Sequence, residues 1–290
     1  MFDDLVKHRV ELEKLKNEIA YKVLKQFAQA YPTMKQYIIN INNKNRDLVI
    51  SQIMQTLDQN MGNLSSTVLT NGIDVLKYET QFQTELLSRY KKKSVKSSAV
   101  ISDQLATTLI YDNHMAGDLF KDSWLKMSTG LKSELSGKIR LAVTNGLTAD
   151  QISKEMKGSM VSFSDKQLNS LTRTLIQNAT NIAAEETYKS NDIEYVQYCA
   201  ILDSRTTQIC HDLNGKIFKV GEGPRPPQHY NCRSFTIPVD GKNGIAVDPS
   251  FSAFVDRQAE EEKKGLTSSQ KDKFETTTKI SLDTLIKKLR

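Results

Sequence analysis

Apolar residues recur at helical spacing through most of the first 190 positions of this chain of 290 residues. In the first segment they form one stripe, and charged residues such as Glu13 and Lys16 lie between them, which predicts an amphipathic helix with its charges on the other faces. The apolar positions are Leu5, Leu12, Leu15, Ile19, Val23 and Phe27. Because proline lacks the amide hydrogen that a helix interior uses, Tyr31-Pro32 predicts an interruption.

The same period predicts further helices. One runs from about 44 to 61 and ends at Met61-Gly62-Asn63, and another runs from about Ser65 to Tyr90. A third, Ser123 to Asn145, carries an apolar stripe made of Leu125, Met127, Leu131, Leu135, Ile139 and Leu141.

Two capping boxes predict two more helix starts, one at Thr148–Gln151 and one at Ser164–Gln167. The second start leads into a long amphipathic helix that we expect to reach about Ser190.

The pattern changes near residue 193, where β-branched and aromatic residues become frequent. Segments 193–202, 216–220 and 234–239 are predicted strands, and Asn214-Gly215 between them is typical of a type I′ turn. A unit this small cannot bury much core, so we expect it to pack on the helix before it. The predicted fold class is therefore mainly α with a small antiparallel β module (α+β) near the C-terminus.

Five segments follow from these patterns. They are an N-terminal helical region (1–92), a basic, serine-rich linker (93–104), a second helical region (105–191), the β-containing module (192–247) and a charged helical tail (248–290). The basic run offers candidate contacts to DNA phosphates, or else it is a solvated hinge; its lysines are Lys91, Lys92, Lys93 and Lys96.

Composition narrows the classes of protein that fit. Hydrophobic residues make up 38% and charged residues 26%, a balance typical of long helices with much exposed surface. The net charge of +6 fits contact with nucleic acid and equally fits a solvated surface. No run approaches the roughly 20 apolar residues of a membrane span, the acidic N-terminus does not read as a secretory signal, and an odd, low cysteine count favours a reducing compartment.

Cysteine and histidine gather in one short window. All three cysteines and two of the four histidines lie between residues 199 and 232. A zinc site would use Cys210, His229 and Cys232, with Asp203 or His211 as the fourth ligand. Structural zinc sites usually have two tight pairs of ligands, and His229-x-x-Cys232 is the one clear pair. The alternative is that the two cysteines are small buried residues and His229 is a hydrogen-bonded turn residue.

The same residues also fit two catalytic arrangements. Cys210 could be a nucleophile with His229 or His211 as its base, and a nuclease could use His229 with Arg233 as a phosphate clamp. No nucleophile elbow or thiol-protease signature supports the first, so we expect a protein that is not an enzyme. Pro226-Pro227 is expected to give a rigid, extended segment that presents His229.

The order of these residues resembles the signature of the phage Mu F-like head morphogenesis family, the minor head proteins of tailed phages. The matching positions are Tyr198, Asp203, Thr206, Cys210, Asn214, Gly215, Phe218, Pro226, Pro227, His229, Cys232 and Arg233. The preceding helix, from Arg173 to Tyr188, is similar to the family's helix in its Thr, Asn and Ala content, so the resemblance covers about residues 120–240. Many members carry cysteine where this chain has Gln208 and Ser234.

The resemblance implies a structural role in the virion, at the head and portal, after assembly in the host cytoplasm. Its implied partners are the portal ring and, by extension, packaged double-stranded DNA and a scaffold or capsid protein. The implied activities are head morphogenesis and the handling or ejection of packaged DNA. The alternative from another class is a nucleic-acid-cleaving enzyme or toxin-like module that uses His229 and Cys210.

Overall fold

A computed structural model describes residues 2–90 and 101–239 of the chain. Lys91, Lys92, Lys93 and Lys96 lie outside the described residues, and so does the predicted tail 248–290. The candidate DNA contacts of the basic run therefore stay predictions.

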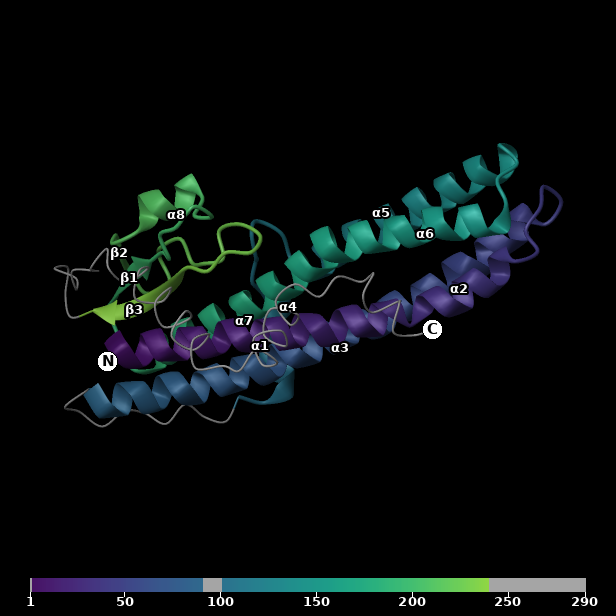
Figure 1. Cartoon of the computed structure of the whole chain (residues 1–290). Helices are drawn as coiled ribbons and strands as arrows, with labels where there is room; N and C mark the ends of the chain where they lie inside the picture. Colours follow the sequence, from purple (N-terminus) through teal and green to yellow (C-terminus); the bar gives the residue numbers. More distant parts are fainter. Residues whose placement is uncertain (1, 91–100, 240–290) are drawn as a thin grey trace, which may run out of the picture. The chain divides into compact units, whose positions relative to one another are not determined.

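The described residues are mainly helical with one small sheet, as predicted (Figure 1). None of the helices described is both long and apolar enough to cross a membrane. In chain order the elements are α1 (Phe2–Ala28), α2 (Ala30–Ile38), α3 (Arg46–Tyr90), α4 (Asp103–Asp112), α5 (Phe120–Thr144), α6 (Ala149–Phe163), the π-helical turn η1 (Ser164–Leu168), α7 (Asn169–Ser190), β1 (Tyr195–Cys199), α8 (Gln208–Leu213), β2 (Ile217–Lys219) and β3 (Phe235–Val239).

Contacts divide the described chain into two compact units. The first contains the start of α1 as far as Lys16, segment Leu69–Phe120, and the described residues from Arg173 onward. The second contains Asn17–Val68 and Lys121–Thr172. Each unit is thus assembled from segments distant in sequence.

The second unit is a set of packed helices. Phe27 of α1 meets Phe163 of α6 with ring centroids 5.3 Å apart, and Tyr31 of α2 donates to the Ser153 carbonyl at 3.4 Å. The predicted interruption near Pro32 is confirmed, because α1 ends at Ala28 and α2 begins at Ala30. Pro32 lies in the first turn of α2, where a missing amide hydrogen costs no helical hydrogen bond.

The predicted break at Met61-Gly62-Asn63 is wrong, because α3 runs through it without interruption. A glycine costs a helix only about 1 kcal/mol relative to alanine. Residues on either side continue one buried stripe, made of Leu57, Met61, Leu64 and Val68. Burial of that stripe outweighs the weak local preference.

One predicted capping box is confirmed and the other is wrong. Thr148 accepts from the Gln151 amide at the start of α6, and the Gln151 side chain accepts from the Thr148 amide in return. Ser164 has helical angles instead, and its hydroxyl donates to the Val161 carbonyl at 3.0 Å. The helical path therefore passes through η1 into α7 rather than restarting.

Some predicted faces are also wrong. Leu125 and Leu141 were placed on the buried stripe of α5 but are 65% and 62% exposed. Lys16 was placed on an outer face but is buried, where it donates to the Glu13 carboxylate at 2.5 Å and also to the Gln177 side chain. A partner from α7 makes burial of this ammonium group tolerable.

The first unit holds the sheet, whose strand order is β2-β1-β3 with antiparallel pairs. One face packs on α1 and α3 through Leu5 and Leu86, which contact Cys199 and Phe235. Val196 packs on Tyr188 near the end of α7, which confirms that the module leans on the preceding helix. In Figure 1 the strands lie between the start of α1 and helix α8.

The Asn214-Gly215 turn differs in type from the prediction. Asn214 has φ −57° and ψ 129°, while Gly215 has φ 80°. A type I′ turn needs positive φ at both central residues, whereas type II needs it at the second alone. Lys216 donates to the Leu213 carbonyl at 3.0 Å, so this is a type II turn that joins α8 to β2.

Candidate metal centre

Three of the predicted metal ligands meet in the folded protein. Cys210 lies on α8, whereas His229 and Cys232 come from the loop between β2 and β3. Cys210 Sγ lies 3.2 Å from His229 Nε2 and 3.7 Å from Cys232 Sγ. The three ligand atoms lie within 4.8 Å of one another, with both cysteines buried and His229 partly exposed. The spacing of these residues in the sequence therefore folds into one compact donor set.

The imidazole of His229 is held in a fixed orientation. Its Nδ1 lies 2.8 Å from the Tyr230 carbonyl oxygen, which is an acceptor only. A proton on Nδ1 satisfies that contact and leaves the Nε2 lone pair directed at Cys210. This is the arrangement by which proteins select the metal-binding nitrogen of histidine.

The two thiols share their protons unequally. A hydrogen bond from Cys232 lowers the pKa of Cys210 and outweighs the burial that would raise it. The same contact, with burial, raises the pKa of Cys232. Tyr198 lies 3.3 Å from Cys210 Sγ, and burial raises the pKa of its phenol, so its hydroxyl stays protonated and can donate to the sulfur. Of the two thiols, Cys210 is therefore the more readily deprotonated.

Helix α7 holds the loop that carries His229 and Cys232. Thr174 Oγ1 accepts from the Asn231 amide at 2.9 Å. Gln177 donates to the Ser234 carbonyl at 2.7 Å, and Asn178 Oδ1 accepts from Arg225 at 2.8 Å. These buried polar residues belong to the Thr- and Asn-containing helix of the resemblance, and they bond loop groups that would otherwise be unsatisfied.

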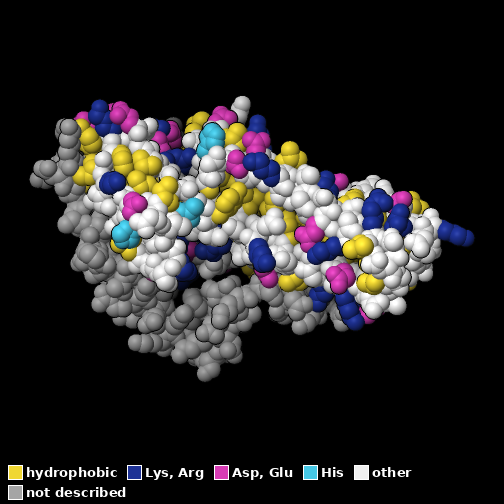
Figure 2. All heavy atoms as spheres, turned by 90° about the horizontal axis from the view of Figure 1, so that it is seen from above, with side chains coloured by type: hydrophobic (Ala, Val, Ile, Leu, Met, Phe, Trp, Pro, Cys, Tyr) yellow, Lys and Arg dark blue, Asp and Glu magenta, His cyan; other side chains and the backbone are white. Residues whose placement is uncertain are grey.

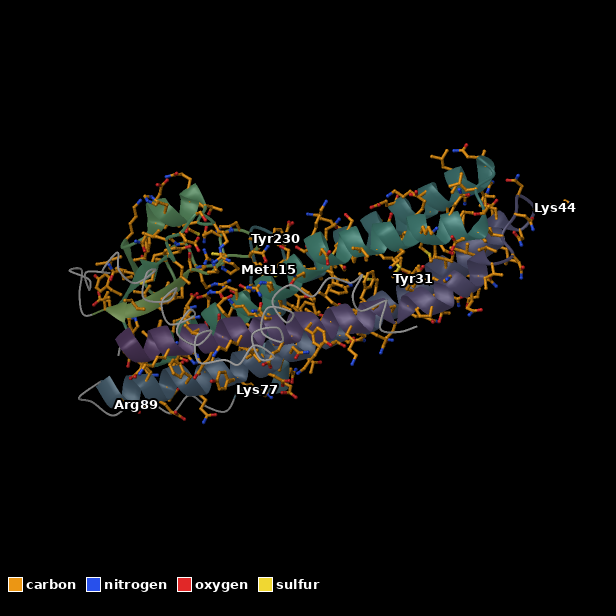
Figure 3. The ribbon with its side chains drawn as sticks, viewed as in Figure 1. Tyr31, Lys44, Lys77, Arg89, Met115 and Tyr230 are labelled. Carbon is orange, nitrogen blue, oxygen red and sulfur yellow. The ribbon has the colours of Figure 1, made fainter. Side chains whose placement is uncertain are left out.

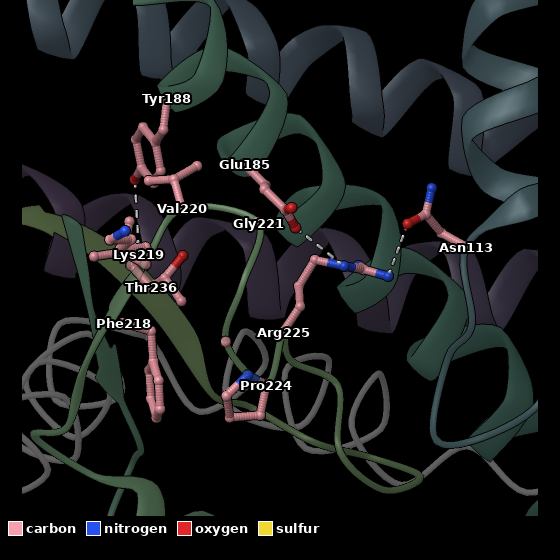
Figure 4. A pocket seen from close by; sticks show the side chains of 12 residues that line it. Asn113, Glu185, Tyr188, Phe218, Lys219, Val220, Gly221, Pro224, Arg225 and Thr236 are labelled. Atoms are coloured by element: carbon pink, nitrogen blue, oxygen red, sulfur yellow. Dashed lines mark hydrogen bonds and ion pairs between the residues drawn. The ribbon is translucent and has the colours of Figure 1, made fainter. Parts of the chain in front are cut away.

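Arg225 is a central residue that the sequence reasoning missed. Besides Asn178 it contacts Glu185 at 3.3 Å and donates to the His114 carbonyl at 3.1 Å. It borders a cavity of about 230 Å³ that Tyr188, Glu185 and Asn113 also line (Figure 4). Its position directly before Pro226-Pro227 was the available signal, because an arginine beside a rigid loop can join it to neighbouring segments.

Asp203 lies outside the donor set. Arg233 Nη2 donates to its Oδ1 at 2.5 Å, and Arg205 Nη2 donates to its Oδ2 at 3.0 Å. Burial would raise the pKa of this carboxyl, but hydrogen bonds from the two arginines hold it below its usual range. His211, the other candidate fourth ligand, is largely exposed and lies 3.7 Å from Asp212. Neither belongs to the ligand group found among the described residues.

The remaining signature residues shape the backbone around the cluster. Thr206 Oγ1 accepts from the Asp203 amide at 2.8 Å, and Asn214 Oδ1 accepts from the Ala200 amide at 2.9 Å. A Cβ on Gly223 would lie 2.4 Å from Phe218 Cβ. This close approach leaves no room for a side chain at position 223.

The double proline fixes the loop from its other side. Pro226-Pro227 is a cis peptide bond rather than part of a continuously extended segment as predicted. The Pro227 carbonyl accepts from the Ala116 amide at 3.1 Å. This hydrogen bond joins the loop that carries Tyr230 to the loop that carries Met115; the two residues are labelled in Figure 3.

Charges on the face visible in Figure 2 are mixed. Lysine and arginine side chains alternate with acidic ones there, and they do not gather into one broad basic field. Among the described residues, Lys132 pairs with Asp58 at 2.7 Å and Arg173 with Glu13 at 2.8 Å.

A known protein family matches the part of the chain that contains this site. A family model described as Phage Mu protein F like protein matches residues 133–237. This part of the chain is similar to the Mu F-like family. The match runs from within α5 to β3 and includes the whole donor set, which confirms the resemblance on its motif residues. A search of curated proteins and a search of solved structures each found no match for the chain.

The Mu F-like segment thus spans α6, α7 and most of the sheet module. Helices α1 to α4 lie before the matched residues. The family is named after a phage protein. Its match to this segment indicates a role in head morphogenesis of a bacteriophage, in line with the sequence resemblance.

Proposed function

We propose that this chain is a minor head protein of a tailed phage that associates with the portal ring and has no enzymatic activity. The observation that carries the proposal is the Mu F-like match over residues 133–237. Its localisation would be the virion, in the region of head and portal, after assembly in the host cytoplasm.

The use of the charged side chains around the candidate site supports a structural role. Asp203 is neutralised by Arg233, and Arg225 joins α7 to the loop after α4. A hydrolase would be expected to direct such charged groups toward a substrate. Here they join α7, α8 and the β2–β3 loop to one another, so the module is built as a rigid body that can be docked.

The helical part suits partner contacts. Leu48, Leu125 and Leu141 are each more than 60% exposed on α3 and α5. A contiguous exposed apolar patch is typical of a partner interface, and Leu48 and Leu141 directly follow Asp47 of α3 and Arg140 of α5, which pair with each other in the same unit. We assign this surface to the portal or to a scaffold or capsid protein.

Contact with packaged DNA is the second part of the proposal. It rests on the net charge of +6 and on the basic run that includes Lys91, Lys92, Lys93 and Lys96, which lies outside the described residues. Binding through phosphates would be independent of sequence and would weaken as salt rises. Handling or ejection of DNA would follow from a position at the portal.

Co-purification tests the proposal against its alternatives. The chain is expressed with the portal protein of its own phage, and the complex is isolated and incubated with duplex DNA. We expect the chain to elute with the portal ring and to leave the DNA intact. DNA cleavage that His229→Ala abolishes and His211→Ala preserves would favour the nuclease instead. Salt-sensitive binding to DNA with no portal association would favour a DNA-binding protein without a portal role.

A further inference from the structure

We propose that Cys210, Cys232 and His229 Nε2 bind one zinc ion, which joins α8 to the β2–β3 loop. The proposal does not depend on the portal role, because it follows from the side chains alone. Two sulfur donors and one imidazole form a ligand set that binds zinc in preference to hard cations such as Mg²⁺.

The ligand spacing fits a tetrahedral ion. Bonds of about 2.3 Å to sulfur and about 2.0 Å to nitrogen, at tetrahedral angles, place two sulfurs about 3.8 Å apart, and sulfur and nitrogen about 3.5 Å apart. The corresponding distances here are 3.7 Å for Cys210 Sγ to Cys232 Sγ and 3.2 Å for Cys210 Sγ to His229 Nε2. These two distances differ from the tetrahedral ones by a few tenths of an ångström or less, and all three ligand atoms lie within 4.8 Å of one another.

The same distances argue against a disulfide. A disulfide joins its sulfurs at about 2.05 Å, far shorter than the 3.7 Å between these two. Both thiols are free, as is Cys199. Cys199 lies in the other hydrophobic cluster of the sheet, with Leu5 and Phe235, so it provides a matched buried cysteine away from the centre.

The surroundings are preorganised for a metal. The Tyr230 carbonyl directs the Nε2 lone pair of His229 toward the sulfurs, and the Tyr198 hydroxyl supports the Cys210 sulfur. Such outer contacts orient ligands in known zinc sites. The buried polar residues of α7 hold the loop that carries two of the three donors.

The fourth position is not filled by His, Cys, Asp or Glu from the described part of the chain. Asp203 is held by Arg233, and His211 is exposed. We therefore assign three protein ligands and a water molecule to the ion. The metal would close the chain between residues 210 and 232, so that binding contributes directly to folding stability.

Metal analysis of the purified full chain tests the site. The protein is produced in zinc-supplemented medium under reducing conditions, dialysed, and measured for zinc by elemental analysis. We expect about one zinc per chain in the wild type, in Cys199→Ala and in His211→Ala, and background in Cys210→Ser and Cys232→Ser. Equal zinc in all variants, or a Cys210–Cys232 disulfide in the intact mass without metal, would overturn the site.

A second measurement covers variants that fail to fold. Wild-type protein is stripped with a chelator and titrated with cobalt(II), which absorbs visibly in tetrahedral sites and shows a thiolate charge-transfer band. We expect saturation at one equivalent, displacement by zinc, and a melting temperature that rises with added zinc. An absence of the thiolate band together with an unchanged melting temperature would refute zinc binding.

Discussion

Arg233 forms an ion pair with Asp203, thirty residues earlier in the chain, with Nη2 2.5 Å from Oδ1. The pair joins the first and last charged positions of the Mu F-like signature. Both side chains are largely buried, at 15% and 16% exposed. Because Thr206 also bonds the Asp203 amide, the start of the signature is fixed before α8 begins.

Removing one partner of this pair should destabilise the module. Asp203→Asn leaves Arg233 without its anionic partner, and we expect a loss of about 2 kcal/mol in the free energy of unfolding. Urea denaturation at neutral pH measures it. Asp150→Asn is the control, because Asp150 is an exposed partner of Lys154 on α6, and it should change stability by less than about 0.5 kcal/mol. An Asp203 variant as stable as that control would contradict the role of the pair.

The same carboxylate predicts a dependence on pH. The pKa of Asp203 is lowered in the folded state, so the unfolded chain binds more protons as the solution is acidified. The stabilisation is therefore complete above the unfolded pKa of about 3.9 and is lost as pH falls below it. The stability difference between wild type and Asp203→Asn, measured from pH 7 to pH 3, should shrink at the acid end. A constant difference would refute the assignment.

Gly223 should tolerate no side chain. Gly223→Ala places a Cβ 2.4 Å from Phe218 Cβ, an atom bonded directly to the β2 backbone rather than the movable end of a side chain. We expect a loss of about 1–3 kcal/mol from overpacking. Gly137→Ala on α5 is the matched control: nothing lies within 4 Å of its added Cβ, and helix propensity should raise stability by about 0.5–1 kcal/mol. Thermal melts of both variants test the contrast.

Gly62→Ala tests the continuity of α3. Its added Cβ meets nothing within 4 Å, and α3 is helical on both sides. Alanine should therefore stabilise the protein by about 0.5–1 kcal/mol. A loss of stability would mean that the chain needs glycine there for a break. Chemical denaturation of this single variant distinguishes the two results.

The sequence predicted elements better where burial and local preference agreed. Leu131, Leu135 and Ile139 are buried in α5 as the period predicted, and the three strands lie where aromatic and β-branched residues gather. The predictions at Ser164 and Gly62 are wrong because each residue gives a local signal for a helix terminus. Burial of the apolar stripe that continues past it keeps the chain helical. Local chemistry could not reveal that stripe's partner.

The sequence predicted which residues meet at the candidate site, but not most of the contacts that hold them there. Cys210, His229 and Cys232 meet as their spacing suggested. Arg225, Gln177 and Tyr198 hold or border them through contacts between distant segments. Tyr198 is part of the resemblance and Arg225 precedes the double proline, but the groups that they contact depend on how α7, α8 and the loop pack. The same reason explains why Asp203 was counted as a ligand although Arg233 holds it elsewhere.

The composition of portal complexes from mature particles tests the central claim most directly. Particles of the phage that encodes this chain are opened, portal complexes are purified, and their components are identified and counted by mass spectrometry. A minor head protein should be present with the portal ring in few copies per particle. Absence of the chain from both particles and portal complexes, while it is present in the infected cell, would contradict the proposed function.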